Sequence, residues 1–170
     1  MMPAVRLLAV LGILALGTVL GLRWYQDRPA APEPLPTLTL AVLDGRASFD
    51  PAAIEGPYLL NLWGSWCPYC EMEHPVLMAL QAEGIAIYGI AFRDTAAAAN
   101  ASLDSLGDPF AGVMLDVDGR SAQALGIAGT PETLVVGIDG RILTRWSGPL
   151  TAHVLRNRIY PALERGAQRD

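Results

Sequence analysis

Residues 61–77, NLWGSWCPYCEMEHPVL, decide the fold and hold the only two cysteines of the 170-residue chain. The stretch begins inside an apolar run, residues 58–63, which has the length and composition of a buried strand. Residues 68–83 then show the spacing of a helix. Cys67 and Cys70 are therefore predicted at the junction where a strand meets the N-terminus of a helix.

This position suits thiol chemistry. Unpaired N–H groups and the positive end of the helix dipole stabilise a thiolate, so Cys67 is predicted to be the exposed nucleophile. Cys70, one turn later, is predicted to be the more buried resolving thiol. Pro68 fits the first helical turn. Glu73, one turn after Cys70, is interpreted either as its proton carrier or as an acid that the helix dipole favours.

Other uses of the pair are possible but less well supported. A purely structural disulfide would close a very small loop, which stabilises a fold little. A copper carrier could use Cys67, Cys70 and His74, although His153 is the only other histidine in the sequence. Haem attachment needs a histidine directly after the second cysteine, where this chain has Glu71. We therefore expect thiol–disulfide exchange, with the Cys67–Cys70 disulfide as redox centre and no metal or other cofactor.

Outward from this motif, apolar runs alternate with helical patterns. The sequence Asp139-Gly140 between two apolar runs is a strong hairpin signal. We expect an α/β fold, a mixed sheet with helices on both faces. The expected elements are an edge strand at 37–43, strands at 58–63, 85–92, 113–115, 133–138 and 142–146, and helices at 68–83, 95–106, 121–125 and 151–164.

The N-terminus carries a separate apolar segment. Residues 7–22 are 16 consecutive uncharged residues followed by Trp24 and Tyr25, which suit a membrane interface. An uncleaved transmembrane anchor over residues 1–25 is favoured over a cleaved signal peptide, because no small-residue cleavage site follows the run directly. Residues 26–37 hold four prolines and are predicted to form an extended linker, which leaves 38–170 as the folded domain.

Composition narrows the functional classes. Hydrophobic residues are 52% and charged residues 17% of the chain, which excludes a disordered protein. All 12 basic residues are arginine and the net charge is −5; after residue 28, 9 arginines face 16 acidic residues. Binding to nucleic acid is therefore not expected.

Four separated stretches resemble a known family. They are NLWGSWCPYCEMEHPVL (61–77), GIAFRDT (89–95), GIAGTPETLVVGIDGRI (126–142) and SGPLT (147–151). Together they resemble the membrane-tethered thioredoxin-like proteins of bacterial cytochrome c maturation, the DsbE/CcmG type. The match runs in order across most of residues 37–165.

The resemblance implies a thioredoxin-like fold with a central insertion, here within residues 93–125. It implies a reductive role in the periplasm, on a single-pass anchor in the bacterial inner membrane. Electrons would come from a membrane thiol reductase and pass to disulfides of apocytochrome c or of a partner thiol protein. A general periplasmic thioredoxin-like reductase is the alternative with the same fold. We expect a monomer.

The resemblance also implies roles for individual residues. It implies a cis peptide bond at Thr130-Pro131 against the disulfide, where the backbone can pair with a substrate strand. Glu73 and Glu132 would be the acidic residues near the cysteines. Asn61 stands where thioredoxins have a buried aspartate, which strengthens Glu73 as proton carrier.

Substrate docking is predicted at six residues around the cysteines. The dipeptide between the cysteines is more familiar from glutaredoxins than from this subgroup, and it helps to set the reduction potential. The six residues are Trp66, Pro68, Tyr69, Thr130, Pro131 and Glu132.

Overall fold

The computed structural model describes residues 17–18 and 31–168 and divides the chain into two units, Met1–Ala30 and Ala31–Asp170. In the first unit only Gly17 and Thr18 are described, and both are helical. Most of the expected anchor therefore lies outside the described residues. Among the residues that are described, no helix is both long and apolar enough to cross a membrane.

The strand and helix around the cysteines form as predicted. Strand β3 (Tyr58–Trp63) is buried at all six positions, and helix α2 (Pro68–Ala82) follows after a short turn. Cys67 is the N-cap of α2 and Pro68 occupies its first turn. Pro75 lies inside α2, which continues across it as one helix and not as the two shorter pieces that an interior proline allows. The cysteines thus lie at one end of the central strand.

Strand β3 is the middle of a seven-stranded mixed sheet in the described part of the chain, with the order β1-β7-β6-β3-β4-β5-β2. Strands β4 (Ile87–Phe92) and β5 (Gly112–Asp116) run parallel to β3. On the other side β6 (Glu132–Val136) and β7 (Arg141–Ser147) form the hairpin predicted from Asp139-Gly140.

Both edges of the sheet are short and come from the N-terminal part of the domain. The edge strand expected at 37–43 is only β2 (Ala41–Val42), antiparallel to β5. At the opposite edge β1 (Glu33–Pro34) pairs with β7, within the segment expected to be an extended linker. Isolated two-residue strands give no period in a sequence, so the pattern did not indicate β1.

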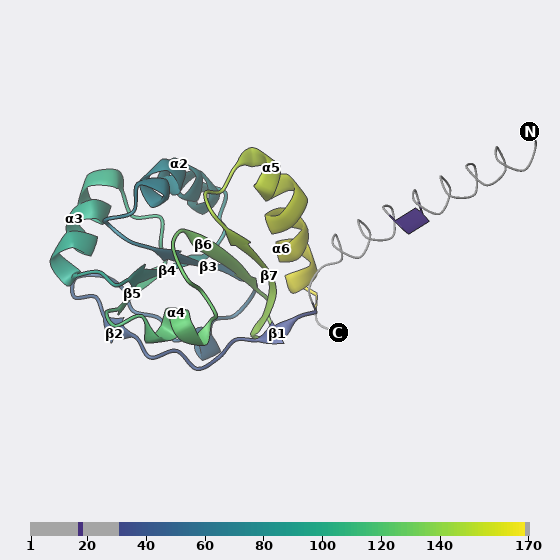
Figure 1. Cartoon of the computed structure of the whole chain (residues 1–170), viewed down its shortest axis with the longest axis horizontal. Coiled ribbons are helices and arrows are strands. Elements are labelled where there is room, and N and C mark those ends of the chain that lie inside the picture. Colours follow the sequence, from purple (N-terminus) through teal and green to yellow (C-terminus); the bar gives the residue numbers. More distant parts are fainter. Residues whose placement is uncertain (1–16, 19–30, 169–170) are drawn as a thin grey trace, which may run out of the picture. The chain divides into compact units, whose positions relative to one another are not determined.

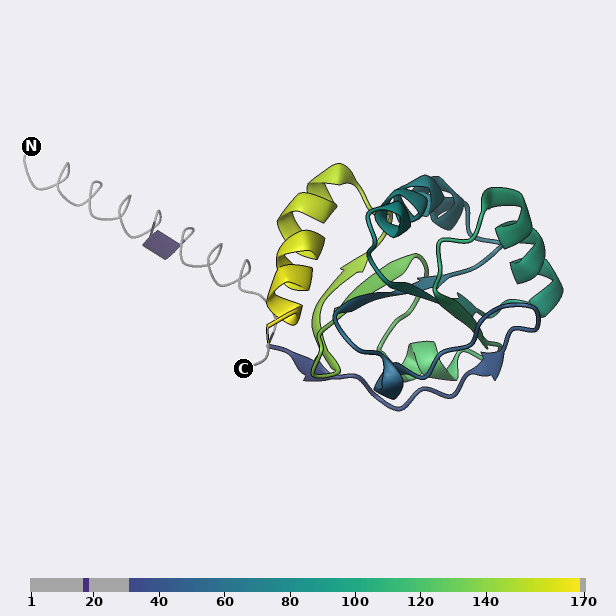
Figure 2. The ribbon, with the colours of Figure 1, turned by 180° about the vertical axis from the view of Figure 1, so that it is seen from behind.

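Helices cover both faces of the sheet (Figures 1 and 2), which confirms the predicted α/β class. Helices α2, α3 (Ala96–Leu106), α5 (Ala152–Val154) and α6 (Tyr160–Gly166) lie on one face, and α4 (Arg120–Ala124) lies on the other. A short 3-10 helix, η1, spans Pro51–Ala53. The predicted C-terminal helix is interrupted by a π-helical turn, η2 (Leu155–Ile159), which ends two residues before Pro161, a residue with no N–H to donate.

Two hydrophobic clusters follow from this layering. The cluster on the α2 face includes Leu59, Leu77 and both cysteines, and the cluster on the α4 face includes Leu60, Leu62 and Leu125. Successive residues of β3 thus point to opposite faces, as a strand requires. The expected insertion, residues 93–125, contains α3, β5 and α4.

Candidate active site

The two cysteines are joined in a disulfide at the N-terminus of α2, with their Cα atoms 5.3 Å apart. The sulfur of Cys67 accepts a hydrogen bond from the backbone N–H of Cys70 at 3.2 Å. This N–H belongs to the first helical turn, where backbone donors have no partner inside the helix. The same contact would stabilise a thiolate on Cys67 after reduction.

Exposure does not separate the two cysteines as expected. Cys67 was predicted to be exposed and Cys70 more buried, but in the disulfide their exposed fractions are 4% and 6%. That prediction is wrong for the oxidised state, because both residues pack into the cluster on the α2 face. The helical position of Cys67 is what distinguishes it as the attacking thiol.

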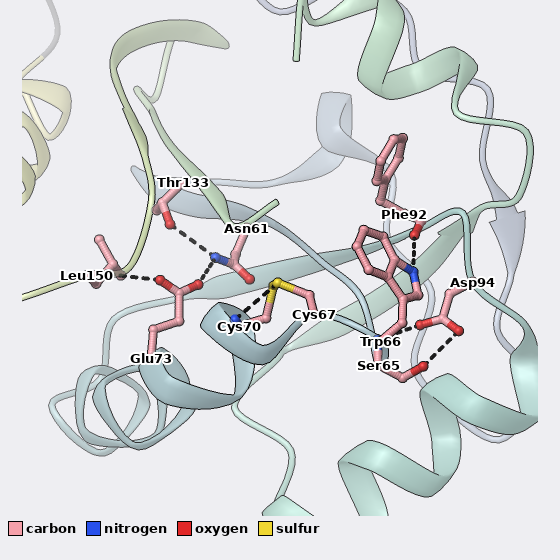
Figure 3. The surroundings of a disulfide bond; sticks show 10 residues. All are labelled: Asn61, Ser65, Trp66, Cys67, Cys70, Glu73, Phe92, Asp94, Thr133 and Leu150. Carbon is pink, nitrogen blue, oxygen red and sulfur yellow. Dashed lines mark hydrogen bonds between the residues drawn. A yellow bond between two sulfur atoms is a disulfide. The ribbon is translucent and has the colours of Figure 1, made fainter. Parts of the chain in front are cut away.

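Glu73 is buried in a hydrogen-bond network beside the disulfide (Figure 3). Its Oε1 accepts from Nδ2 of Asn61 at 2.9 Å, and its Oε2 accepts from the backbone N–H of Leu150 at 2.9 Å. The same Nδ2 donates to Oγ1 of Thr133 at 3.0 Å, while Oδ1 of Asn61 has no hydrogen-bond partner among the described residues. A carboxylate on α2 is thereby tied to strands β3 and β6 and to the loop before α5.

The network leaves Glu73 able to exchange a proton near neutral pH. Burial raises the pKa of Glu73 to about 7, because a charged carboxylate is poorly solvated there. The hydrogen bonds from Asn61 and Leu150 act in the opposite direction, but burial outweighs them. This environment favours the proton-carrier interpretation of Glu73 over that of an ordinary first-turn acid.

Exposed side chains surround the disulfide on its solvent side. Trp66 and Tyr69 are 53% and 59% exposed, and Pro68 is also exposed. Met72, which the sequence did not single out, is 67% exposed. An apolar surface next to a reactive disulfide suits contact with another polypeptide.

Trp66 is fixed in place although half of it is exposed. Its indole Nε1 donates to the carbonyl oxygen of Phe92 at 3.2 Å, and the two rings lie 6.3 Å apart. A Cβ atom on Gly64 would lie 2.8 Å from the indole, so this glycine makes room for the ring. The geometry holds Trp66 over the end of β4 (Figure 3).

Asp94 is a structural member of the site that sequence reasoning missed. It is buried, and its carboxylate accepts from the backbone N–H of Ser65 at 2.6 Å and from Oγ of Ser65 at 2.9 Å. It therefore fixes the turn just before Cys67. Its position two residues after the parallel strand β4 could have indicated this role, since the carboxyl ends of parallel strands meet at one edge of the sheet.

The expected cis bond at Thr130-Pro131 is confirmed. Pro131 is buried at the start of β6, and its carbonyl oxygen accepts from the N–H of Gly148 at 2.9 Å. The hydroxyl of Thr130 is buried without a hydrogen-bond partner in the described part of the chain. Strand β6 then reaches Thr133, which belongs to the Glu73 network.

Glu132 lies on the other face of the sheet from Glu73. Its backbone pairs with Leu62, whereas Thr133 pairs with Asn61 and shares the α2 face with Glu73. The Glu132 carboxylate accepts from Oγ of Ser147 at 2.8 Å and lies 3.8 Å from the guanidinium of Arg145. Strand alternation thus puts Glu73 and Glu132, the two acids that the resemblance implies near the cysteines, on opposite faces of the sheet.

His74 takes part in a structural contact. Its Nε2 lies 3.0 Å from the carbonyl oxygen of Gly107, which can only accept, so Nε2 carries the proton and donates. Among the residues that the structure describes, no three His, Cys, Asp or Glu side chains gather so as to hold a metal ion. No observation here favours the copper carrier.

Comparisons with known proteins agree with this geometry. Residues 30–159 match the Redoxin family. The chain is 33% identical to the thiol:disulfide interchange protein HelX of Rhodobacter capsulatus over 167 residues, which cover 92% of this chain and 95% of that protein. It is 37% identical to DsbE of Escherichia coli over 136 residues, which cover 78% and 74% of the two chains. The chain belongs to the Redoxin family, among its DsbE-type thiol:disulfide interchange proteins.

A solved structure supports the fold of this DsbE-type chain. The thio-disulfide isomerase of Thermus thermophilus superimposes with a TM-score of 0.64 at 26% identity, covering 84% of this chain and 99% of that one. The fold is therefore thioredoxin-like, and the resemblance drawn from the sequence is confirmed. With its cysteine pair, this DsbE-type protein is a thiol:disulfide oxidoreductase and exchanges disulfides with a partner thiol or disulfide.

Proposed function

We propose that this DsbE-type protein reduces disulfides of apocytochrome c, or of a partner thiol protein, during cytochrome c assembly. In this proposal the N-terminal segment anchors the domain on the periplasmic side of the bacterial inner membrane, and a membrane thiol reductase supplies the electrons. The Cys67–Cys70 pair is the redox centre and needs no further cofactor.

The observation that carries the reductive direction is the burial of Glu73 one helical turn from Cys70. In its ionised form the buried Glu73 carboxylate disfavours a second negative charge nearby, so it disfavours a lasting thiolate on Cys70, although it can take the Cys70 proton during exchange. Anything that destabilises the reduced pair makes the pair a better electron donor.

The proposed reaction has two exchange steps. The Cys67 thiolate attacks one sulfur of the partner disulfide, forms a mixed disulfide and releases the other partner sulfur as a thiolate, which takes a proton. Cys70 then gives its proton to the Glu73 carboxylate and attacks the Cys67 sulfur, which releases the second partner sulfur. The partner gains two electrons, and the chain is left with the Cys67–Cys70 disulfide.

Trapping in cells tests the proposal. A Cys70→Ser variant cannot resolve the mixed disulfide, so it should accumulate a partner linked through Cys67 and released by dithiothreitol. Mass spectrometry of the released protein should identify a cytochrome c or a thiol protein of its assembly. A Cys67→Ser, Cys70→Ser double variant is the control. General periplasmic proteins as the main trapped partners would instead support a general reductase.

The direction of electron flow is measured separately. Equilibration with a thiol redox buffer should give a reduction potential nearer to about −270 mV, as in thioredoxin, than to about −120 mV, as in the oxidant DsbA. A potential near the second value contradicts the reductive role.

A further inference from the structure

Arg93, directly after β4, adopts a backbone conformation that costs energy. Its φ is 47°, and it is the single non-glycine residue of positive φ within residues 17–18 and 31–168. A left-handed residue with a side chain is destabilised by about 1 kcal/mol or more, and such residues gather at functional sites. The backbone N–H of Arg93 donates to the carbonyl oxygen of Asp116 at 2.9 Å, which holds this conformation.

A second special position accommodates the Arg93 side chain. Its guanidinium carbon lies 5.1 Å from the ring centre of Phe92, in a cation–π contact. A Cβ atom on Gly119 would lie 2.8 Å from Nε of Arg93, and Gly119 itself has a φ of 78°. The left-handed backbone conformations of Arg93 and Gly119 therefore both serve to place the Arg93 guanidinium.

The charge of Arg93 is not neutralised by another residue within 31–168. The residue is exposed and makes no ion pair with any residue that the structure describes. Asp118, an acid of the same groove, pairs instead with Arg120 at 2.9 Å. The Arg93 guanidinium is thus available to an anion from outside.

Arg93 lines a groove of about 400 Å³ that adjoins the active site. Phe92 forms one wall of this groove and also holds the indole of Trp66, the residue before Cys67 (Figure 3). Ala128, two residues before Thr130 of the cis bond, is exposed and adds apolar surface, while Ile127 beside it is buried. The remaining lining residues are Asp118, Gly119, Gln123 and Gly126.

We propose that this groove, lined by residues 92–93, 118–119, 123 and 126–128, docks an acidic stretch of the partner polypeptide next to its reacting cysteines. An Asp or Glu side chain of the partner pairs with Arg93, while apolar partner atoms pack against the exposed Ala128. The inference rests on the proposed function, because it concerns the partner of the same disulfide. A guanidinium matches the planar geometry of a carboxylate with two parallel hydrogen bonds.

Local charge decides this recognition. The domain as a whole is acidic, which by itself would repel an acidic partner. At about 0.15 M salt, however, charges more than about 8 Å apart are largely screened, so the contact at Arg93 outweighs distant acids.

The test uses the full chain and three peptides of equal length. Serine replaces cysteine in all three, and they differ only in carrying Asp, Asn or Lys at the positions next to that serine. Binding is followed by tryptophan fluorescence, since Trp66 is half exposed and adjoins the groove. Arg93→Gln should weaken binding of the Asp peptide about threefold relative to the Asn peptide, a typical effect for an exposed ion pair. Arg93→Glu should reverse the preference, so that the Lys peptide binds better than the Asp peptide.

Two further variants sharpen the test. Arg158→Glu makes the same change of net charge on the exposed side of η2 and should leave the Asp-to-Lys preference unchanged. Gly119→Ala keeps the charge but displaces the guanidinium, and should weaken binding of the Asp peptide. The inference is overturned if Arg93→Glu keeps the Asp-to-Lys preference of the wild type. It is also overturned if Arg158→Glu shifts that preference as much as Arg93→Glu does.

Failure of the proposed function is read from the Cys70→Ser trap and from the reduction potential. Exchange of a small neutral disulfide by the wild-type chain tests separately that the thiol chemistry works without the groove. Because the peptides lack cysteine, their binding preference stands or falls independently of that exchange.

Discussion

Glu73 acts through its environment and not through its position in the sequence alone. It accepts hydrogen bonds from Asn61, 12 residues away in the chain, and from Leu150, 77 residues away. These partners keep the buried acid satisfied, while burial raises its pKa to about 7. A group with such a pKa can both take and return a proton near neutral pH.

The pH dependence of disulfide resolution should depend on Glu73. Above pH 7 its carboxylate is ionised and can take the proton of Cys70, so the rate of the second exchange step should rise through about pH 7. Glu73→Gln should lose this rise and keep only the titration of the thiols themselves. Single-turnover kinetics at several pH values around 7 measure the rate of this second step, and the Glu71→Gln variant, changed at an exposed residue, is the control. Identical profiles for wild type and Glu73→Gln would return Glu73 to a structural role.

Stability should change with pH for the same reason. The pKa of Glu73 is raised in the folded protein, so the folded state binds more protons than the unfolded state between pH 4.5 and about 7. Unfolding free energy of the oxidised protein should therefore fall by about 3 kcal/mol as pH rises through this window, relative to Glu73→Gln. Urea unfolding of both variants at several pH values measures the difference. Parallel curves for wild type and Glu73→Gln contradict the raised pKa.

Among the elements, β4 is constrained by the aromatic residues above it. The indole of Trp63 stacks on Phe110 with ring centres 5.7 Å apart, on the face that α2 covers. Gly89 of β4 lies directly beneath this pair, since a Cβ atom there would be 3.0 Å from Nε1 of Trp63 and from Cγ of Phe110. The glycine lets the aromatic layer approach the sheet beside the active site.

Gly89→Ala should therefore destabilise the domain by about 1–3 kcal/mol, the usual cost of overpacking a core. The control is Gly129→Ala, where a Cβ atom has no heavy atom within 4 Å and the change should stay within about 0.5 kcal/mol. Urea unfolding compares the two. Equal stabilities of the two variants would mean that the Trp63–Phe110 layer shifts without cost.

At the scale of the whole molecule, the domain that begins at Ala31 has both faces of its sheet covered. The N-terminal segment is a separate unit, and we propose that it serves only as an anchor.

Cell fractionation tests this proposal. The full chain should sediment with membranes and resist alkaline extraction, whereas a chain expressed from Ala31 behind a cleavable export signal should be recovered in the periplasmic fraction. Recovery of the full chain in the soluble fraction would contradict an uncleaved anchor.

Much of the fold could be predicted because its signals are local. The alternation of apolar runs, the Asp139-Gly140 turn and the start of a helix just after Cys67 each depend on a few neighbouring residues. The edge strand β1 could not be predicted and β2 was predicted only as part of a longer strand, since each is two residues long and exists only through pairing with β7 or β5.

By itself the sequence determined that two cysteines share the N-terminus of a helix after a buried strand, because that depends on neighbours in the chain. Only the tertiary structure decided what surrounds them. It placed Glu73 against Asn61 and Leu150, turned Glu132 to the other face and brought Asp94 under the turn at Ser65. The physical reason is that burial and strand alternation act between segments far apart in the chain, and these set the pKa and the contacts of each group.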